Sequence, residues 1–395
     1  MSSVAAGVDA AEGVVQRTAA LVPLLREHAL TTEHERRVAP ECIAALAEAG
    51  VFRITLPRRY GGYECTLTTQ VEVLTEVARG CGSSSWVAAV YSIGTWLVAL
   101  FADEAQDEVF ATPDTRVSAV ATPSSSARPV AGGYRVTGRW AFNTGCLDAH
   151  WAVLGTLREG SAPESGHMLV AIPYSELAIH DDWFVSGLRG TGSCSVSADD
   201  VLVPEHRVLA MPEATAGRYR SQRNAEVPLY RAPLGPVIVA NSAGTPLGLG
   251  QAALEAFRER LPGRAITFTD YGDQSAAPLT HLQVAEAAMK LDSAAHHARR
   301  AAELVDAKAL ADDAYTTEER ARVRMDLGWV VELARSATQI LQDASGATSI
   351  HDHVPIQRIL RDIEALSLHA VLNPKINLEL YGRVLLGLEP NTKLL

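Results

Sequence analysis

Two polar side chains stand where a protein could do acid–base or oxygen chemistry. The first, His369, follows Arg361 and Asp362 on a stretch with helical periodicity. Histidine has the side chain whose ordinary pKa lies nearest neutrality, as acid–base catalysis requires. Pro374 limits the helix, so we expect His369 near its C-terminal end, where the dipole favours a protonated imidazole. A capping or surface histidine, the commoner fate for one of twelve, is the alternative.

The second is Thr144, in the stretch Trp140 to Gly145. A pattern of alternating residues ends there, so the backbone amides and the hydroxyl of Asn143 and Thr144 are expected to be free to meet a ligand. A β-turn closed by a local threonine hydrogen bond is the alternative.

Other polar groups have weaker signals. The guanidinium of Arg264 has the fork that a phosphate needs, and Phe268, four residues on, would share its helix face; a surface arginine is the alternative. His351, Asp352 and His353 lack a third spaced metal ligand, so we expect a polar loop and no metal site. The five cysteines form no CxxC pair and are expected to be reduced structural thiols.

Composition limits the classes of function. The chain has 395 residues, 47% of them hydrophobic, which is enough for two or three domains. Its net charge of −11 argues against binding to nucleic acid or to an anionic membrane surface. Trp86 to Phe101 is shorter than the roughly 20 residues that span a bilayer, so we expect a buried helix. Met1 to Gly13 shows no secretory signal, and we expect a cytoplasmic protein.

Three regions must position these residues. Residues 1–114 are predicted to be helical, with Leu67, Val71, Leu74 and Ala78 on one face. Residues 115–212 have period two after the turn at Gly132-Gly133. This pattern predicts strands near 134–142, 151–157, 167–172 and 194–203, in an antiparallel barrel or sandwich.

Residues 213–395 return to helical spacing and predict an up-and-down bundle. Two helix faces carry this prediction: Leu327, Val331, Ala334, Thr338 and Leu341, and Ile356, Ile359, Ile363, Leu366 and Ala370. His369 is expected roughly 120° from the second stripe. The fold class is therefore α+β, mostly α: helices, a β domain, then a four-helix bundle.

This order of elements, and four stretches within it, resemble the acyl-CoA dehydrogenase superfamily. Within it, the chain is most similar to flavin-dependent monooxygenases related to 4-hydroxyphenylacetate hydroxylase large components. The stretches are Leu56 to Gly62; Trp140 to Gly145; Gly187 to Ser193 with Val203 to Arg207; and Arg361-Asp362 with His369. The similarity extends from Glu35 to Gly387. Short- and medium-chain dehydrogenases of this kind place their catalytic Glu where this chain has Ala370, which favours oxygenation.

The resemblance implies a chemistry and a set of site residues. Reduced FAD or FMN would react with O2 to form a C4a-hydroperoxide, with Thr144 beside the flavin N5 and His369 orienting substrate or moving a proton. The flavin ring would contact Thr122, Trp140, Asn143, Thr144 and Gly145. The phosphate end of the flavin would contact Arg264, Phe268 and the loop of Gly346, Ala347 and Thr348, which in this family often come from a second subunit. For that loop, a helix C-cap glycine is the alternative. The substrate would contact Gly94, Trp96, Arg189, Thr191 and His369.

One departure bears on the substrate. Many phenol hydroxylases of this group carry a second His where this chain has Gly94, so a simple phenol is in doubt, and the small Gly94 would leave room for a bulkier aromatic or indolic substrate. There are three alternatives: an enzyme that oxygenates the nitrogen of an amino sugar, as nitrososynthases do; an acyl-CoA dehydrogenase; and a non-catalytic flavin-binding protein. The chain has no GxGxxG or GxxxxGK[ST] motif, so a separate NAD(P)H-dependent flavin reductase is expected, and the family implies a homotetramer.

Overall fold

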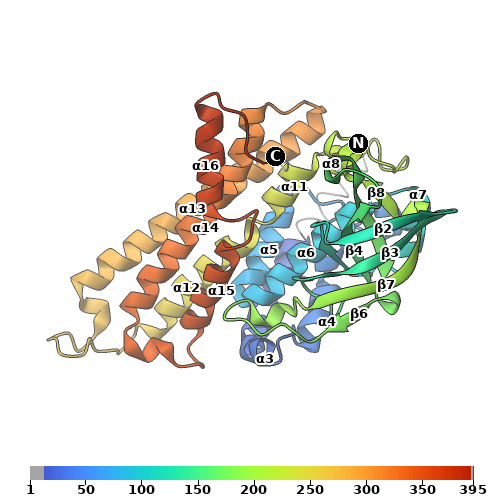
Figure 1. The fold of residues 1–395 in the computed structure, drawn as a ribbon. Coiled ribbons are helices and arrows are strands. Elements are labelled where there is room, and N and C mark those ends of the chain that lie inside the picture. Colours follow the sequence, from blue (N-terminus) through green and yellow to red (C-terminus); the bar gives the residue numbers. More distant parts are fainter. Residues whose placement is uncertain (1–12, 393–394) are drawn as a thin grey trace.

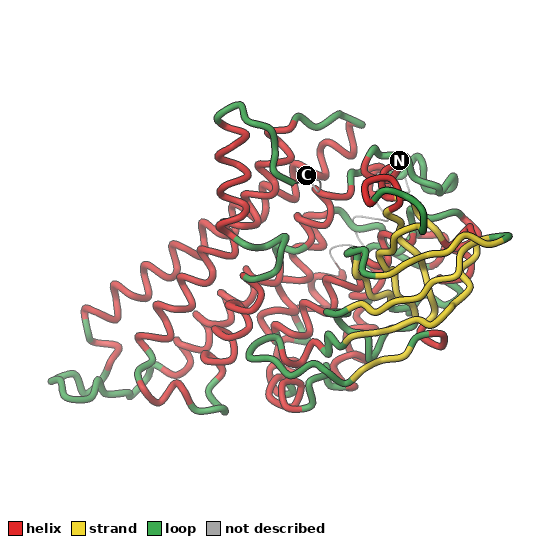
Figure 2. Tube along the Cα trace, viewed as in Figure 1, coloured by secondary structure: helices red, strands yellow, loops and turns green. Residues whose placement is uncertain are grey.

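The computed structural model describes residues 13–392 and residue 395. Residues 1–12, on which the expectation about a secretory signal largely rests, lie outside this range. Helices make up most of the fold, and the strands gather at one end of it (Figures 1 and 2). No helix in the described part of the chain is both long and apolar enough to cross a bilayer.

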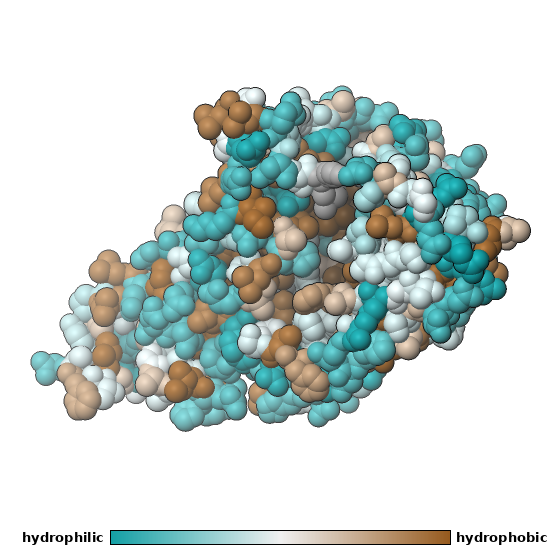
Figure 3. Space-filling model, viewed as in Figure 1, coloured by the Kyte–Doolittle hydropathy of each residue, from teal (hydrophilic) through white to brown (hydrophobic). Residues whose placement is uncertain are grey.

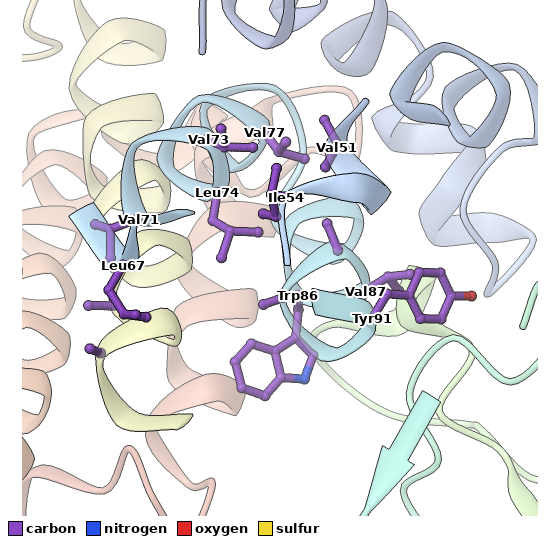
Figure 4. Packing of buried hydrophobic residues seen from close by; sticks show 14 of the residues in the cluster. Val51, Ile54, Leu67, Val71, Val73, Leu74, Val77, Trp86, Val87 and Tyr91 are labelled. Atoms are coloured by element: carbon purple, nitrogen blue, oxygen red, sulfur yellow. The ribbon is translucent and has the colours of Figure 1, made fainter. Parts of the chain in front are cut away.

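The N-terminal part consists of helices around a buried pair. The elements are α2 (Val22–Glu27), α3 (Ala29–His34), α4 (Pro40–Ala49), α5 (Leu67–Gly80), α6 (Gly82–Val98) and α7 (Asp103–Val109). The predicted face of α5 is buried, as is nearly all of α6, so both predictions are confirmed. Figure 4 shows Leu67, Val71 and Leu74 turned into this core, while the Tyr91 hydroxyl points away from it, toward the β domain.

The β domain is one sheet of β1 (Val117–Val120), β2 (Ser125–Val130), β3 (Gly133–Trp140), β4 (Trp151–Arg158), β5 (His167–Pro173), β6 (Ala178–His180), β7 (Ser195–Pro204) and β8 (Val208–Ala210). Its order is β6-β7-β3-β2-β4-β5-β8, with β1 paired to β4. The expectation of a purely antiparallel domain is wrong, because β1 and β2 both lie parallel to β4. These two strands follow one another in the same direction with only four residues between them, so β4 can pair with both.

The C-terminal part is the predicted bundle. It contains α11 (Leu234–Asn241), α12 (Gly244–Arg260), α13 (Pro278–Ala311), α14 (Thr317–Ala344), α15 (Pro355–Ser367) and α16 (Pro374–Leu385). Short helices α8 (Pro163–Gly166), α9 (Met211–Thr215) and α10 (Pro228–Arg231) lie in the connections. A capping box of Thr316 and Glu319 begins α14. The predicted face of α14 is buried in full, which confirms that prediction.

The face predicted for the next helix is only partly correct. Ile356, Ile359, Ile363 and Leu366 are buried on α15, but the helix ends at Ser367. Ala370 is exposed and lies beyond the helix, as does His369. The chain turns there because the backbone N–H of Leu372 bonds the carbonyl of His369 and Pro374 begins the next helix.

Specific hydrogen bonds hold the helices to one another and to the β domain. The carboxylate of Asp306 on α13 accepts hydrogen bonds from the N–H groups of Leu67 and Thr68 at the start of α5, at 2.7 and 3.0 Å. Between the domains, the Tyr91 hydroxyl donates to the Gly145 carbonyl at 2.6 Å. Figure 3 shows a hollow on the face where the bundle meets the β domain, with hydrophobic residues at its base.

Candidate active site

The segment Gly187–Ser193 joins the β domain to three helices. Asp362 on α15 accepts a hydrogen bond from the Leu188 N–H at 2.6 Å. Gly190 packs so closely on Thr32 and Ser83 that a Cβ there would lie 2.3 Å from the Thr32 methyl. The segment is therefore fixed by α3, α6 and α15 before it reaches the residues around Thr144.

Thr144 belongs to a chain of buried hydroxyl groups. Its Oγ1 lies 2.8 Å from Ser193 Oγ, which lies 2.7 Å from Thr191 Oγ1. Thr191 in turn donates to the Leu188 carbonyl at 2.8 Å. The structure thus brings together two of the predicted residues, Thr144 and Thr191, through Ser193, to which the sequence analysis gave no role.

The backbone around these hydroxyls is strained. Phe142 and Leu188 have φ values of 60° and 52°, a region that residues with a side chain rarely occupy. Gly145 has φ 75°, and a Cβ there would lie 2.7 Å from the Tyr91 hydroxyl. Each strained residue costs roughly 1–3 kcal/mol, and such strain is concentrated at functional sites.

The expectation of free backbone amides here is wrong. The N–H groups of Asn143, Thr144 and Gly145 bond the carbonyls of Cys194, Phe142 and Thr191. The strand ends at Trp140, but pairing with residues 191–194 satisfies the donors of Asn143 and Gly145, and a local turn satisfies that of Thr144. In contrast, the Asn143 side chain is fully buried, and its Nδ2 has no hydrogen-bond partner.

Phe142 departs from the alternation that the sequence suggested. Trp140 is fully buried, with its indole N–H donating to the Gly155 carbonyl at 2.6 Å, whereas Phe142 is 72% exposed. The positive φ of Phe142 turns its ring outward, where it meets Trp183 edge to face at 5.8 Å between centroids. An exposed aromatic ring two residues from Thr144 is a candidate platform for a planar ligand.

His369 lies against the indole of Trp86 on α6, with 5.4 Å between ring centroids. Residue 369 is exposed at the surface of the single chain, yet the protein around its imidazole partly desolvates it. Desolvation, with repulsion from Arg324, lowers the pKa of His369 to about 4. The expected protonated imidazole is therefore wrong, because desolvation and the charge of Arg324 disfavour the protonated form and His369 lies past the helix end.

The hydrogen bonding of His369 also defines its tautomer. Its Nδ1 accepts a hydrogen bond from the Val371 N–H at 3.3 Å. A neutral imidazole that accepts at Nδ1 carries its proton on Nε2. His369 therefore offers Nε2–H as a hydrogen-bond donor at neutral pH.

Arg361 and Asp362 support the site from α15. Arg361 bonds Glu33 on α3 at 2.6 Å and donates to the Ser186 carbonyl at 2.6 Å. Burial raises the pKa of Asp362 to about 6, although the Leu188 N–H and Arg358 favour its charged form. The predicted residue Arg189 lies next to this group, 3.9 Å from Glu33 and half-exposed.

Gly94 and Trp96 have packing roles that sequence reasoning missed. A Cβ at Gly94 would lie 2.1 Å from the Val117 carbonyl oxygen, so the space beside Gly94 is filled by β1. The expectation of extra room for substrate is therefore wrong. Trp96 is fully buried, and its indole N–H donates to the Leu229 carbonyl.

Thr122 is exposed in the break between β1 and β2. The carbonyl carbon of Thr122 borders Gly155, where a Cβ would lie 2.8 Å from it. Trp140 bonds the same glycine from the sheet side. These two predicted residues are thus neighbours across Gly155.

A second cluster forms at the far end of the bundle. Arg264 donates to the Ser345 carbonyl at 2.6 Å and to Thr348 Oγ1 at 3.2 Å, so the predicted arginine and the loop of Gly346, Ala347 and Thr348 lie together. Phe268 is fully exposed, and the expectation that it shares a helix face with Arg264 is wrong, because both residues lie in the loop between α12 and α13. This end lies across the bundle from the β domain (Figure 1).

The remaining histidine clusters hold no metal-ligand group in the described residues. His351 and His353 stack on each other in an exposed loop. His297 is partly buried, and its Nδ1 lies 2.8 Å from the carboxylate of the buried Asp326. The structure adds four candidate site residues to which sequence reasoning gave no role: Ser193, Phe142, Trp86 and Asp362. Ser193, Phe142 and Asp362 lie in the quoted motifs, but no spacing signal identifies their partners.

Comparison with known proteins gives consistent matches. Two family models match: "Acyl-CoA dehydrogenase, N-terminal domain" over residues 15–113 and "Acyl-CoA dehydrogenase, C-terminal domain" over residues 240–374. The chain is 34% identical to the FADH(2)-dependent resorcinol hydroxylase, oxygenase component, of a Rhizobium species, with 95% of each chain covered. It is 34% identical to the flavin-dependent monooxygenase, oxygenase subunit HsaA, of Rhodococcus jostii, with 95% of this chain and 98% of the other covered.

Solved structures match equally well. The crystal structure of 3-HSA hydroxylase from Rhodococcus sp. RHA1 gives a TM-score of 0.91 at 32% identity, covering 97% of this chain and 99% of that one. XiaF from a Streptomyces species, in complex with FADH2 and glycerol, gives a TM-score of 0.91 at 30% identity, covering 99% of each chain.

Proposed function

The chain belongs to the oxygenase components of the flavin-dependent monooxygenases, in the acyl-CoA dehydrogenase superfamily, and we propose that it hydroxylates the ring of a small phenol. The enzyme uses reduced flavin and O2, and a separate reductase supplies the flavin. The single observation that carries the site assignment is the buried Thr144 hydroxyl at the end of its hydroxyl chain, beside strained and exposed Phe142.

The residues around Thr144 fit a flavin ring. A flavin presents a flat apolar face and a polar edge, and Phe142 and Thr144 offer the matching aromatic ring and hydroxyl oxygen. The unpaired Nδ2 of Asn143, buried one residue away, is the donor that a carbonyl on the same edge needs. The resorcinol hydroxylase is FADH(2)-dependent and the XiaF structure is in complex with FADH2, so reduced FAD is the form we propose.

Bound reduced flavin supplies the activation of O2, from which one oxygen atom passes to the substrate. Thr144 would hold the polar edge of the ring in place, and Phe142 would limit its tilt. His369 is neutral at neutral pH and presents Nε2–H, so its proposed role is to donate a hydrogen bond to a substrate oxygen and orient the ring. Arg189, on the segment that carries Thr191, is proposed to contact the substrate at the same site.

A phenol is the preferred substrate class for two reasons. The relative named as a resorcinol hydroxylase is 34% identical, whereas one named as an indole-3-acetate monooxygenase is 26% identical. The donor at His369 suits a phenolic oxygen.

The phosphate end of the flavin is proposed to bind Arg264 and Thr348 of a second copy. This cluster lies across the bundle from Thr144 of the same chain (Figure 1). Exposed apolar side chains are frequent on α13, α16 and the loops beside Arg264: Phe268, Leu279, Leu282, Met289, Ile350, Ile376, Leu385 and Leu386. Such surfaces mark interfaces, so we propose a homotetramer in which cofactor sites are shared, working in the cytoplasm with an NAD(P)H-dependent reductase.

The experiment is a coupled turnover assay. The purified protein, a flavin reductase, NADH and FAD are incubated under ¹⁸O2 with a panel of phenols, indoles and amino sugars, and products are analysed by mass spectrometry. We expect one ¹⁸O atom on the ring of a phenol. Hydroxylation of indoles alone, or oxidation of amine nitrogen alone, would contradict the proposed substrate class.

A further inference from the structure

The hydroxyl chain that ends at Thr144 has a direction. Each hydroxyl has one hydrogen, and two oxygens 2.7–2.8 Å apart need a hydrogen between them. The Leu188 carbonyl has none, so Thr191 must donate to it. The contact from Thr191 to Ser193 must then use the hydrogen of Ser193.

The same reasoning determines the hydrogen of Thr144. Since Ser193 gives its hydrogen to Thr191, the contact between Ser193 and Thr144 must use the hydrogen of Thr144. All three residues are at least 95% buried, so water does not readily interrupt the chain. Thr144 therefore presents only oxygen lone pairs to a ligand, and the Leu188 carbonyl is the group that dictates this.

A flavin ring has opposite hydrogen-bonding character at N5 in its two redox states. Reduced flavin has an N–H there and donates, whereas oxidised flavin has a lone pair and accepts. An oxygen that can only accept matches the reduced ring and opposes the oxidised one. The oxygenase must bind the reduced form and release the oxidised form, so the direction of the chain suits the proposed function.

We propose that Ser193 and Thr191 are positioning residues that make Thr144 an obligate acceptor and thereby give the site its preference for reduced over oxidised flavin. The inference rests on the proposed function, because it takes Thr144 to meet the flavin N5. It assigns a role to Thr191, which lies two hydrogen bonds from Thr144 and three from the ligand, that packing alone would not give.

The test is the ratio of two dissociation constants. Binding of reduced and of oxidised FAD to the full-length protein is measured anaerobically, by equilibrium dialysis, for the wild type and for Thr191→Val and Ser193→Ala. Thr191→Val keeps the shape of the side chain and removes the hydroxyl. Ser193 can then donate its hydrogen to Thr144, which leaves the hydrogen of Thr144 free to donate to a ligand. Thr156→Val is the matched control, since Thr156 is a buried threonine whose hydroxyl has no partner.

We expect the wild type to bind reduced FAD more tightly than oxidised FAD. Thr191→Val and Ser193→Ala should each lower the ratio of the two affinities by about 10-fold, the effect of one hydrogen bond. Thr156→Val should leave the ratio unchanged. A ratio that is the same in the wild type and in folded Thr191→Val and Ser193→Ala would overturn the inference alone. Failure of the wild type to bind either form would overturn the proposed function, and the inference with it.

Discussion

Replacing Asp362 by Asn should change how the stability of the protein depends on pH. Asp362 is 5% exposed and accepts the Leu188 N–H at the start of the segment that carries Thr191 and Ser193. Burial raises its pKa from the ordinary 3.8 to about 6. The native state therefore keeps a proton in a pH range in which the unfolded chain has released it.

The sign and size of the effect follow from this difference. Because the folded pKa of Asp362 is raised, the stability that this group contributes is fully present below pH 3.8 and is lost as the pH rises through about 6. A shift of about two pKa units corresponds to about 3 kcal/mol. The amide of Asp362→Asn does not titrate, so the variant lacks this loss. Relative to the variant, the wild type should lose up to about 3 kcal/mol between pH 4 and pH 7.

Urea unfolding followed by tryptophan fluorescence measures this difference, at one protein concentration because assembly would alter apparent stability. Glu364→Gln is the control, since Glu364 lies on the same helix with a half-exposed side chain; it should show no comparable pH-dependent difference. If the difference in free energy of unfolding between the wild type and Asp362→Asn stays constant from pH 4 to pH 7, Asp362 is not a buried carboxyl with a raised pKa.

Three further predictions concern other residues. Gly94→Ala places a Cβ 2.1 Å from the Val117 carbonyl and should lower the free energy of unfolding by roughly 1–3 kcal/mol; an unchanged melting temperature with a wider substrate range would contradict this. Arg264→Ala should weaken binding of FAD about 10-fold and leave riboflavin binding unchanged; equal losses for both, measured by fluorescence titration, would remove the phosphate role. Because the pKa of His369 is about 4, the product formed per NADH consumed should not change between pH 6 and 8 through titration of this residue. His369→Gln should form more product per NADH than His369→Ala. A dependence of product per NADH on pH that is centred near 6.5 and is absent from both variants would show that His369 works as a charged group.

Periodicity was enough to predict the order of helical and strand regions along the chain. The buried faces of α5 and α14 follow from apolar spacing, because a helix with one apolar stripe must bury it. The mixed pairing of the sheet could not be predicted in this way, since the direction in which β1 and β2 meet β4 depends on the path of the chain and not on alternation.

The candidate site was predictable in its residues more than in its contacts. Thr144 and Thr191 lie in motifs that the resemblance identified, but the hydrogen bond between Thr144 and Ser193 spans 49 positions. The outward turn of Phe142 depends on a positive φ that no alternation pattern encodes. The neutral state of His369 depends on Trp86 and Arg324, which come from other helices.

The most direct test of the central claim is rapid mixing of the anaerobic protein, loaded with reduced FAD, with oxygenated buffer. We expect flavin oxidation in at least two phases, through a transient whose absorbance differs from that of both reduced and oxidised flavin, and a shorter-lived transient in Thr144→Ala. Oxidation in a single phase at the rate of free flavin, together with reduction of bound oxidised FAD by an acyl-CoA, would contradict the account and favour a dehydrogenase.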